Sequence, residues 1–318
     1  MPTPSRPQPG DRLTGEALQP DLYGVLVTFR RPSELAEMLA AITRQTRSLR
    51  RLVVVDNAPS EDAERLVRSD APEAEYVASA ENLGPAGALA VGMERVLEVA
   101  HDDDWIVTLD DDDPPTDDDV FARLFDFARA RHACDPATGA VGLTGTRFDR
   151  RRGRVVRVPD AELHGAVEVD YIGGNQFPMY SVRAARAVGV PRRDLFFGFD
   201  DLEYGLRLRD RGYVLSASGE EWLRARGRYG RLGGGPAPAV SLGEANWRRY
   251  YSLRNLVAIL RECGSPGAAV RVSVLTAFAK PLVNLPRRPH AALAHLRLAS
   301  KACADGWSGR MGRSVEPT

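Results

Sequence analysis

Four consecutive aspartates, Asp110 to Asp113, are the residues of this sequence whose type and spacing best suit chemistry. They directly follow an apolar run, residues 105–109, which is typical of a buried strand. Carboxylates packed this closely repel one another unless they are solvated or bind a cation. The run therefore predicts either a site for Mg²⁺ or Mn²⁺, gripped by Asp110 and Asp112, or a solvated acidic loop that caps the next helix.

Two further acidic positions follow predicted elements. Asp56 ends the apolar run 52–55, where it could bind a base or ribose or simply form a turn. Asp200 and Asp201 open a predicted helix that extends to Arg211. A carboxylate there is stabilised by the helix dipole without any function, but one of the two could also serve as a general base for an incoming hydroxyl. The residues alone leave these alternatives open.

The elements that position these carboxylates alternate between strand-like and helical patterns. This alternation predicts an α/β fold with βαβ units and a mostly parallel sheet flanked by helices. Strands are expected at residues 23–28, 52–55, 75–79, 105–109, 140–146, 167–172 and from 213, helices at 32–42, 61–68, 86–100 and 118–131, and a hairpin at 148–158. The carboxyl ends of parallel strands meet at one edge, so the acidic residues should converge there.

Composition limits the class of protein. The 318 residues are 43% hydrophobic and 27% charged, which indicates a globular chain with a formal net charge of zero. From Arg248 to the end, however, 12 Lys or Arg accompany only 3 Asp or Glu. This basic tail could bind an anionic membrane surface or be merely solvated, and Val270 to Leu285 could lie along a bilayer or face a core. Three widely spaced cysteines and no signal peptide favour a cytoplasmic location, possibly peripheral on the inner face of the membrane.

The predicted organisation has three parts: a disordered N-terminal segment 1–20, a catalytic domain 21–263, and a basic helical C-terminal extension 264–318. Residues 227–238 are rich in glycine and are expected to form a mobile loop, and residues 224–238 are our candidate for a closing loop or a disordered insertion.

Six motifs, taken in order, resemble the family-two inverting glycosyltransferases of GT-A fold over about residues 23–260. They are residues 23–31, the strand end 53–57, the loop 82–84, the aspartate run, residues 197–207, and Trp247, Tyr250, Tyr251, Arg254 and Asn255. The stretch 199–207 resembles the galactofuranosyltransferase branch in particular, which suggests UDP-galactofuranose as the donor. Rhamnosyltransferases that use dTDP-rhamnose share most of the pattern.

The resemblance implies a role for each matching residue. Nucleotide binding falls to Thr28, Phe29, Arg30, Asp56, Asn82, Gly84, Asp110 and Asp111. The DXD aspartates Asp110 and Asp112 would bind Mn²⁺ or Mg²⁺, and Asp201, with Asp200 beside it, would be the catalytic base. The sugar and acceptor pocket would be formed by Gly173, Gly174, Asn175, Trp222 and Arg254, with Arg254 approaching the diphosphate. One departure stands out, because members of this branch usually place a metal-ligating histidine where this chain has Glu220 and Glu221, which could act as oxygen ligands instead.

The expected reaction is metal-dependent, inverting transfer of a sugar from a nucleotide diphosphate to a hydroxyl of a glycan, lipid-linked or natural-product acceptor. Two alternatives remain. A nucleotidyltransferase would need a glycine-rich loop after its first strand, which Thr28 to Pro32 lacks. A protein that binds nucleotide sugars without chemistry would be distinguished by a lack of donor turnover. Nucleic-acid binding is not expected, because few aromatic residues accompany the basic tail.

Overall fold

The computed structural model describes residues 19–234, 246–286 and 288–316. The segment predicted to be disordered, 1–20, lies almost entirely outside these ranges, as does the end of the predicted loop 224–238.

Eight strands form one mixed sheet in the order β3-β2-β1-β4-β9-β5-β10-β8. Strands β3, β2, β1 and β4 run parallel, as do β5 and β10, while β9 and β8 are antiparallel to their neighbours. The predicted mostly parallel α/β sheet is confirmed. The strands are β1 (Leu22–Thr28), β2 (Arg51–Asp56), β3 (Glu75–Ala78), β4 (Trp105–Asp110), β5 (Thr138–Gly142), β8 (Ala166–Glu168), β9 (Met179–Ser181) and β10 (Val214–Ser218). A separate hairpin, β6 (Arg147–Asp149) and β7 (Arg154–Val156), matches the hairpin expected at 148–158.

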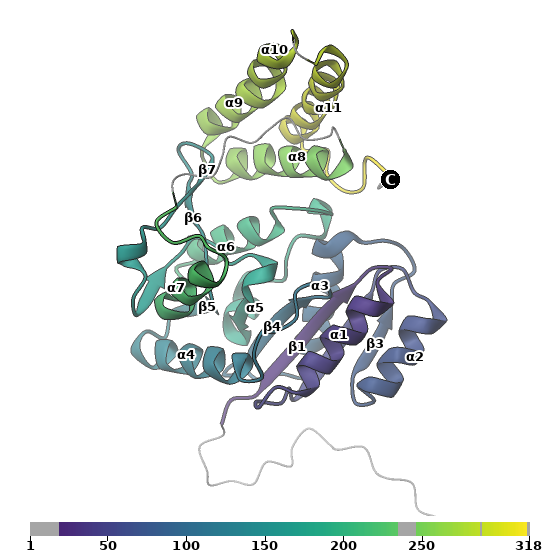
Figure 1. Ribbon diagram of the computed structural model, residues 1–318, viewed down its shortest axis with the longest axis vertical. Coiled ribbons are helices and arrows are strands. Elements are labelled where there is room, and N and C mark those ends of the chain that lie inside the picture. The colour runs from purple at the N-terminus through teal and green to yellow at the C-terminus, as the bar shows by residue number, and fades with distance from the viewer. Residues whose placement is uncertain (1–18, 235–245, 287, 317–318) are drawn as a thin grey trace, which may run out of the picture.

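Helices cover both faces of the sheet, as Figure 1 shows. They are α1 (Pro32–Thr43), α2 (Glu61–Asp70), α3 (Gly84–Leu97), α4 (Val120–Cys134), α5 (Val182–Val188), α6 (Asp200–Asp210) and α7 (Gly219–Arg228). Every residue of strand β1 is buried, so this part of the sheet needs helices on both of its faces. Its Leu22 and Leu26 pack in the core with residues of α1 and α4, while Val25 and Val27 pack on the other face with residues of α3.

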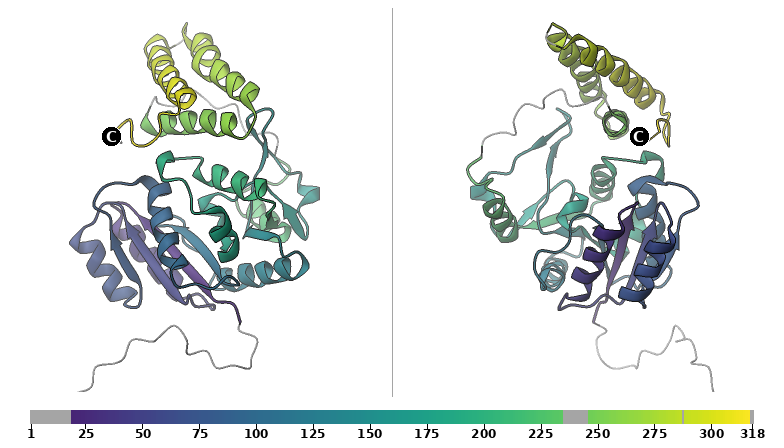
Figure 2. Two further views of the ribbon diagram at one scale, coloured as in Figure 1. Left: turned by 180° about the vertical axis from the view of Figure 1, so that it is seen from behind. Right: turned by 45° about the vertical axis from the view of Figure 1, so that its right-hand side comes forward.

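Four more helices stand over the carboxyl ends of β1 and β4, at the top of Figure 1 and again in both views of Figure 2. They are α8 (Trp247–Glu262), α9 (Pro266–Val274), α10 (Lys280–Asn284) and α11 (Pro289–Ser308), with one π-helical segment, Leu275–Ala279, between α9 and α10. Tyr250 and Tyr251 of α8 share a core with residues of α9 and α11 and with Phe196 and Leu202. The boundary predicted after Cys263 therefore falls within one packed helical unit that begins at α8.

Two features differ from the expected elements. The short strand β9 was not predicted, although it fills the sheet between β4 and β5. Residues 224–228, expected in a loop, are the last part of α7, where Ser218 caps the helix by accepting a hydrogen bond from the Glu221 amide. None of the helices described has both the length and the hydropathy needed to cross a membrane.

Candidate functional site

The strands that follow β1 lie on both sides of it, with β2 and β3 on one side and β4 on the other. The acidic residues lie outside the carboxyl ends of β1 and β4. Ligands of open α/β sheets bind at such a switch point. Asp111 ties the two strand ends together, because its Oδ2 accepts hydrogen bonds from the Thr28 hydroxyl at 2.7 Å and from the Phe29 amide at 3.2 Å. Asp110 is left free to face the other way, into a cavity.

The turn at Gly173 and Gly174 lies next to both Asp110 and Asp201. A Cβ at Gly174 would lie 2.5 Å from Asp110 Oδ2, and a Cβ at Gly173 would lie 3.2 Å from Asp201 Oδ2. A side chain at Gly174 would therefore require the Asp110 carboxylate to move. The turn holds open the space that the two carboxylates share.

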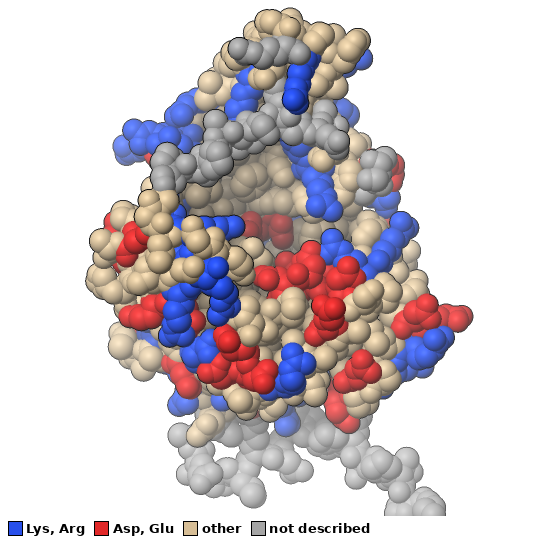
Figure 3. Space-filling model, viewed as in Figure 1, with Lys and Arg blue, Asp and Glu red and all other residues tan. Residues whose placement is uncertain are grey.

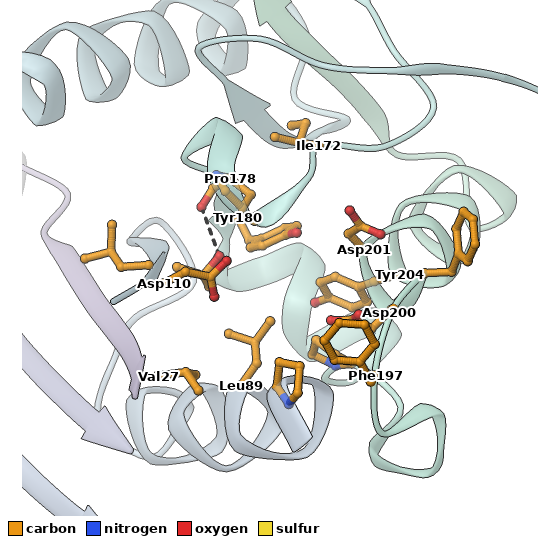
Figure 4. Close-up of a pocket in the computed structure, with 17 residues that line it drawn as sticks. Val27, Leu89, Asp110, Ile172, Pro178, Tyr180, Phe197, Asp200, Asp201 and Tyr204 are labelled. Carbon is orange, nitrogen blue, oxygen red and sulfur yellow. Dashed lines mark hydrogen bonds between the residues drawn. The ribbon is translucent and has the colours of Figure 1, made fainter. Parts of the chain in front are cut away.

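This space is a cavity of about 220 Å³, which we call the carboxylate cavity. Asp110 lies on one side of it, and Asp200 and Asp201 lie on the other, with the ring of Tyr180 between them (Figure 4). Apolar side chains such as Val27 and Leu89 form much of the remaining wall. An apolar wall with a few convergent polar groups is typical of a small-molecule site.

The start of α6 positions the two carboxylates on the far side. Phe199, just before the helix, has a left-handed backbone conformation with φ of 62°. The Leu202 amide donates a hydrogen bond of 2.7 Å to Asp201 Oδ1, which anchors one oxygen of this carboxylate and leaves the other near Gly173. Asp201 is thus oriented by its own helix, as a base that must meet a substrate hydroxyl requires.

Burial and mutual repulsion make these carboxylates reluctant to ionise. Burial, followed by the charge of Asp200, raises the pKa of Asp110 to about 7. Burial, followed by Asp200 and more weakly by Asp110, raises the pKa of Asp201 to about 7 as well. Burial also raises the pKa of Asp200. Figure 3 shows acidic side chains gathered in the hollow of this face with basic side chains on both sides. Perturbed carboxyl groups in a cavity indicate a functional site.

Two tyrosines of the cavity were missed by the sequence analysis. The rings of Tyr180 and Tyr204 meet edge to face, with centroids 5.0 Å apart. The Tyr204 hydroxyl is buried and has no hydrogen-bond partner in the described part of the chain. Burial raises the phenol pKa of both residues, so both remain protonated and Tyr204 keeps a free donor. The sequence signal for Tyr204 was its place three residues after Asp201, on the next turn of the same helix.

The carboxylates fit a divalent metal together with a diphosphate. Other carboxylates near Asp110 repel its ionised form. A hard cation bound to Asp110 would relieve this repulsion. Asp112 is exposed and pairs with Arg31, which also contacts Asp111 at 3.3 Å, so Asp112 can exchange this partner for a cation. Among the residues described, no three His, Cys, Asp or Glu side chains form a metal-binding group. Two carboxylates suffice for Mg²⁺-type sites in which substrate phosphates complete the coordination.

Glu220 and Glu221 do not join Asp110 and Asp112, so the expectation that they replace the missing histidine is corrected. Glu220 accepts a hydrogen bond from the Gly165 amide at 2.7 Å. Glu221 pairs with Arg123 at 3.0 Å and with Arg224 at 2.9 Å. Both lie in the first turn of α7, where acidic residues are stabilised by the helix dipole. Stabilisation of the start of α7 therefore explains why two acidic residues follow Ser218 and Gly219.

A second, larger cavity of about 860 Å³ opens beside the strand ends, and three of the eight residues predicted to bind the nucleotide line it. Phe29, Arg30 and Asn82 line it as expected, together with residues that were not predicted to bind the nucleotide: Asn57, Trp247, Arg248 and Arg313. Asp56 is buried and accepts hydrogen bonds of 2.8 Å from the Tyr76 hydroxyl and the Ala58 amide. The structure therefore places Asn57, and not Asp56, at the surface of this cavity.

The loop at Gly84 has a structural reason of its own. Gly84 has φ of +68° and lies against the Phe196 carbonyl, where a Cβ would come within 2.1 Å of the oxygen. Its amide donates to Asn82 Oδ1, and its carbonyl accepts from Asn57. Gly84 thus shapes the cavity wall rather than lining it.

Arg254 is a second correction. The sequence placed it near the diphosphate, but its side chain is 0% exposed. Its guanidinium donates to the Leu195 carbonyl at 2.9 Å and to the Gly312 carbonyl at 2.5 Å, and it lies over the Tyr251 ring. Arg254 therefore joins the C-terminal helices to the segment that precedes α6. Asn175 and Trp222, also predicted for the acceptor pocket, line a third cavity beyond Gly174.

Comparison with known proteins agrees with this geometry. Residues 25–175 match the family model described as glycosyl transferase family 2. The chain is 33% identical over 196 residues to the galactofuranosyltransferase GlfT1 of Mycobacterium tuberculosis, which covers 59% of this chain and 64% of that protein. It is 32% identical to the GlfT1 of Mycolicibacterium smegmatis, covering 58% and 64%. The matches thus span less than two thirds of the length of these relatives.

Two solved structures share the fold. The mannosyltransferase PcManGT of Pyrobaculum calidifontis, in complex with GDP-Man and Mn²⁺, superposes with a TM-score of 0.53 at 18% identity and covers 98% of this chain and 91% of its own. GalNAc-T7 with UDP, GalNAc and Mn²⁺ superposes with a TM-score of 0.55 at 10% identity and covers 92% and 58%. The chain therefore has the GT-A fold, and its residues 25–175 are similar to glycosyl transferase family 2.

Proposed function

We propose that this protein transfers a sugar from a nucleotide diphosphate donor to an acceptor hydroxyl, with inversion at the anomeric carbon. The observation that carries the proposal is the placement of Asp110 and Asp201 next to Gly173 and Gly174 in one cavity. Asp110 ends β4, which pairs with β1 next to the cavity lined by Phe29, and Asp201 lies across the carboxylate cavity. This arrangement suits a single displacement with inversion.

In this mechanism the donor nucleotide binds between Phe29, Asn82 and Trp247, with its diphosphate toward Asp110. A divalent cation held by Asp110 and Asp112 would neutralise the charge of the leaving diphosphate. Asp201 accepts the proton of the acceptor hydroxyl as that oxygen attacks. The mostly apolar wall of the carboxylate cavity excludes water, which would otherwise compete with the acceptor.

The donor is proposed to be UDP-galactofuranose, with dTDP-rhamnose as the alternative. Support comes from the two mycobacterial relatives, which are galactofuranosyltransferases, and from the sequence 199–207. The test is donor turnover by the purified chain with a panel of saccharide and lipid-linked acceptors, with Mn²⁺ or with EDTA. We expect UDP release that depends on the metal and on UDP-galactofuranose, and NMR of the product should show an inverted linkage.

Equal turnover with EDTA would refute the metal, and faster turnover of dTDP-rhamnose would refute the donor. Donor binding without turnover under any of these conditions would instead favour a nucleotide-sugar-binding protein.

We also propose that the C-terminal helices bind the surface of an anionic membrane from the cytoplasmic side. The surface from α9 to α10 exposes large apolar side chains, including Phe278 at 50%, Leu282 at 60% and Val283 at 68%. Residues 263–304 contain six Lys or Arg and no Asp or Glu. Exposed apolar side chains in a segment that has basic but no acidic residues suit a helix that lies on the surface of an anionic membrane.

Flotation with vesicles tests this surface. The chain should float with phosphatidylglycerol-containing vesicles and not with phosphatidylcholine alone, and F278S/L282S should abolish flotation. The matched control is V155S, which removes an apolar side chain that is 54% exposed on β7. Undiminished flotation of F278S/L282S would refute the assignment of the surface.

A further inference from the structure

A cavity of about 460 Å³ between α4, α7 and residues 175–177 is lined by six arginines, and we call it the arginine cavity. They are Arg123, Arg157, Arg224, Arg226, Arg228 and Arg231. We propose that this cavity is a subsite for a phosphate group carried by the acceptor saccharide. The proposal rests on the proposed glycosyl transfer and assigns a chemical class to its acceptor.

The lining carries more positive than negative charge, although Asp119 and Asp160, which do not line the cavity, also pair with its arginines. Only three carboxylates, Asp113, Asp117 and Glu221, line the cavity beside the six arginines. Figure 3 shows the basic side chains on this side of the acidic hollow, in the region of α7. A concave, cationic lining concentrates an anionic ligand and favours it over a neutral one.

The ion pairs at this cavity leave donors unused. Glu221 is shared by Arg123 and Arg224, at 3.0 and 2.9 Å. Asp117 is likewise shared by Arg123 and Arg228, at 3.6 and 3.5 Å. Each guanidinium has five N–H donors, so one carboxylate cannot satisfy two of them.

Asp160, at the edge of the cavity, is shared in the same way by Arg157 and Arg226. Arg231 has no carboxylate partner in the described part of the chain, and its guanidinium lies 5.5 Å from the centroid of the Tyr229 ring. It is therefore the arginine most available to a ligand.

The arginine cavity and the carboxylate cavity are lined by neighbouring residues of one turn. Gly174 lines the carboxylate cavity and the next residue, Asn175, lines the arginine cavity. Trp222 forms part of its wall, with the guanidinium of the buried Arg226 5.3 Å from the ring centroid. An acceptor whose hydroxyl meets Asp201 can extend past Asn175, place a sugar ring beside Trp222, and reach the arginines with its next group.

Phosphate is the anion that this lining fits best. Planar guanidinium groups bind phosphate through paired N–H donors, and several arginines around one pocket can contact several phosphate oxygens. In the proposed mechanism the donor diphosphate lies toward Asp110, which does not line the arginine cavity. The anion at the arginines is thus assigned to the acceptor.

Direct binding of sugar phosphates tests the proposal without any need for turnover. Galactose 1-phosphate, galactose and galacturonate are titrated by calorimetry into the chain in EDTA at 150 mM NaCl. We expect galactose 1-phosphate to bind at least about tenfold more tightly than galactose and galacturonate. In R228Q/R231Q this preference should fall by about tenfold, whereas R65Q/R68Q, which removes two exposed arginines from α2, should keep it.

Three results would overturn the proposal. They are equal binding of the three probes to the wild type, equally tight binding of galacturonate and the phosphate, and an unchanged preference in R228Q/R231Q. UDP binding with Mn²⁺ distinguishes the donor from the acceptor, because R228Q/R231Q should leave it unchanged. A matching loss of UDP affinity would assign the cavity to the donor and also overturn the proposal. Failure of UDP-sugar turnover in the wild type would refute the proposed function separately.

Discussion

Replacing Asp110 by Asn should stabilise the metal-free protein increasingly as the pH rises. The folded state raises the pKa of Asp110 from 3.8 to about 7, mainly by burial and then by the charge of Asp200. A carboxyl group with a raised pKa contributes stability below its unfolded pKa and loses it as the pH rises through the folded value. Asn has nearly the shape of the protonated acid and cannot ionise, so D110N escapes this loss.

The magnitude follows from the interval between pH 5 and pH 7. Two pKa units correspond to at most about 2.7 kcal/mol. Asp110 is half-buried, and screening by solvent reduces this to about 1–2 kcal/mol. The advantage of D110N over the wild type in the free energy of unfolding should therefore be about 1–2 kcal/mol larger at pH 8 than at pH 5.

Urea denaturation in EDTA at both pH values measures this difference. The matched control is D103N, which removes an exposed carboxylate before the opposite end of β4. The control should show no such dependence on pH. Mn²⁺ should raise the denaturation midpoint of the wild type at pH 8 but not that of D110N, because a ligand stabilises only the form that binds it. An advantage of D110N that is the same at both pH values would refute the electrostatic reasoning.

Three further predictions concern other residues of the site and its support. Y204F removes a buried hydroxyl that has no hydrogen-bond partner. Thermal denaturation should therefore show unchanged or slightly raised stability, while kcat/KM for transfer falls. A fall in stability of about 2 kcal/mol or more would contradict the absence of a partner. R254M leaves buried carbonyl groups without a hydrogen-bond donor. It should lower the free energy of unfolding by roughly 2–4 kcal/mol in urea titrations. An unchanged free energy of unfolding would show that Arg254 is not buried. G174A should lower kcat/KM for transfer, because its Cβ would displace the Asp110 carboxylate, and a wild-type kcat/KM in G174A would contradict this reasoning.

The sequence was sufficient to predict the half of the sheet that contains β1, β2 and β4. Parallel strands buried on both faces read as continuous apolar runs, so β1, β2 and β4 could be placed from residues such as Val53 to Val55 and Trp105 to Leu109. The acidic residues then fell at the correct edge by topology alone. By contrast, β9 has three residues and pairs with strands far away in the sequence, and so short a segment carries no periodicity.

The site was harder to predict because its details depend on contacts between distant segments. Arg254 was assigned to the diphosphate on resemblance, although tertiary packing buries it against the Leu195 and Gly312 carbonyls. Glu220 and Glu221 have the right chemistry for a metal, but the local signal that was overlooked is Ser218, which caps α7. Tyr204 could have been suspected, since it lies one helical turn after Asp201.

If Asp201 is the base of a glycosyl transfer, its replacement by Asn should slow the transfer without weakening donor binding. Transfer from the productive nucleotide sugar is measured under single-turnover conditions with Mn²⁺, together with donor affinity, for the wild type and D201N. We expect a loss of about 10²–10⁴-fold in rate with unchanged donor affinity, and a wild-type rate that falls below about pH 7, where Asp201 becomes protonated. A D201N rate within a few fold of the wild type, at equal donor affinity, would contradict the role of Asp201 as the base.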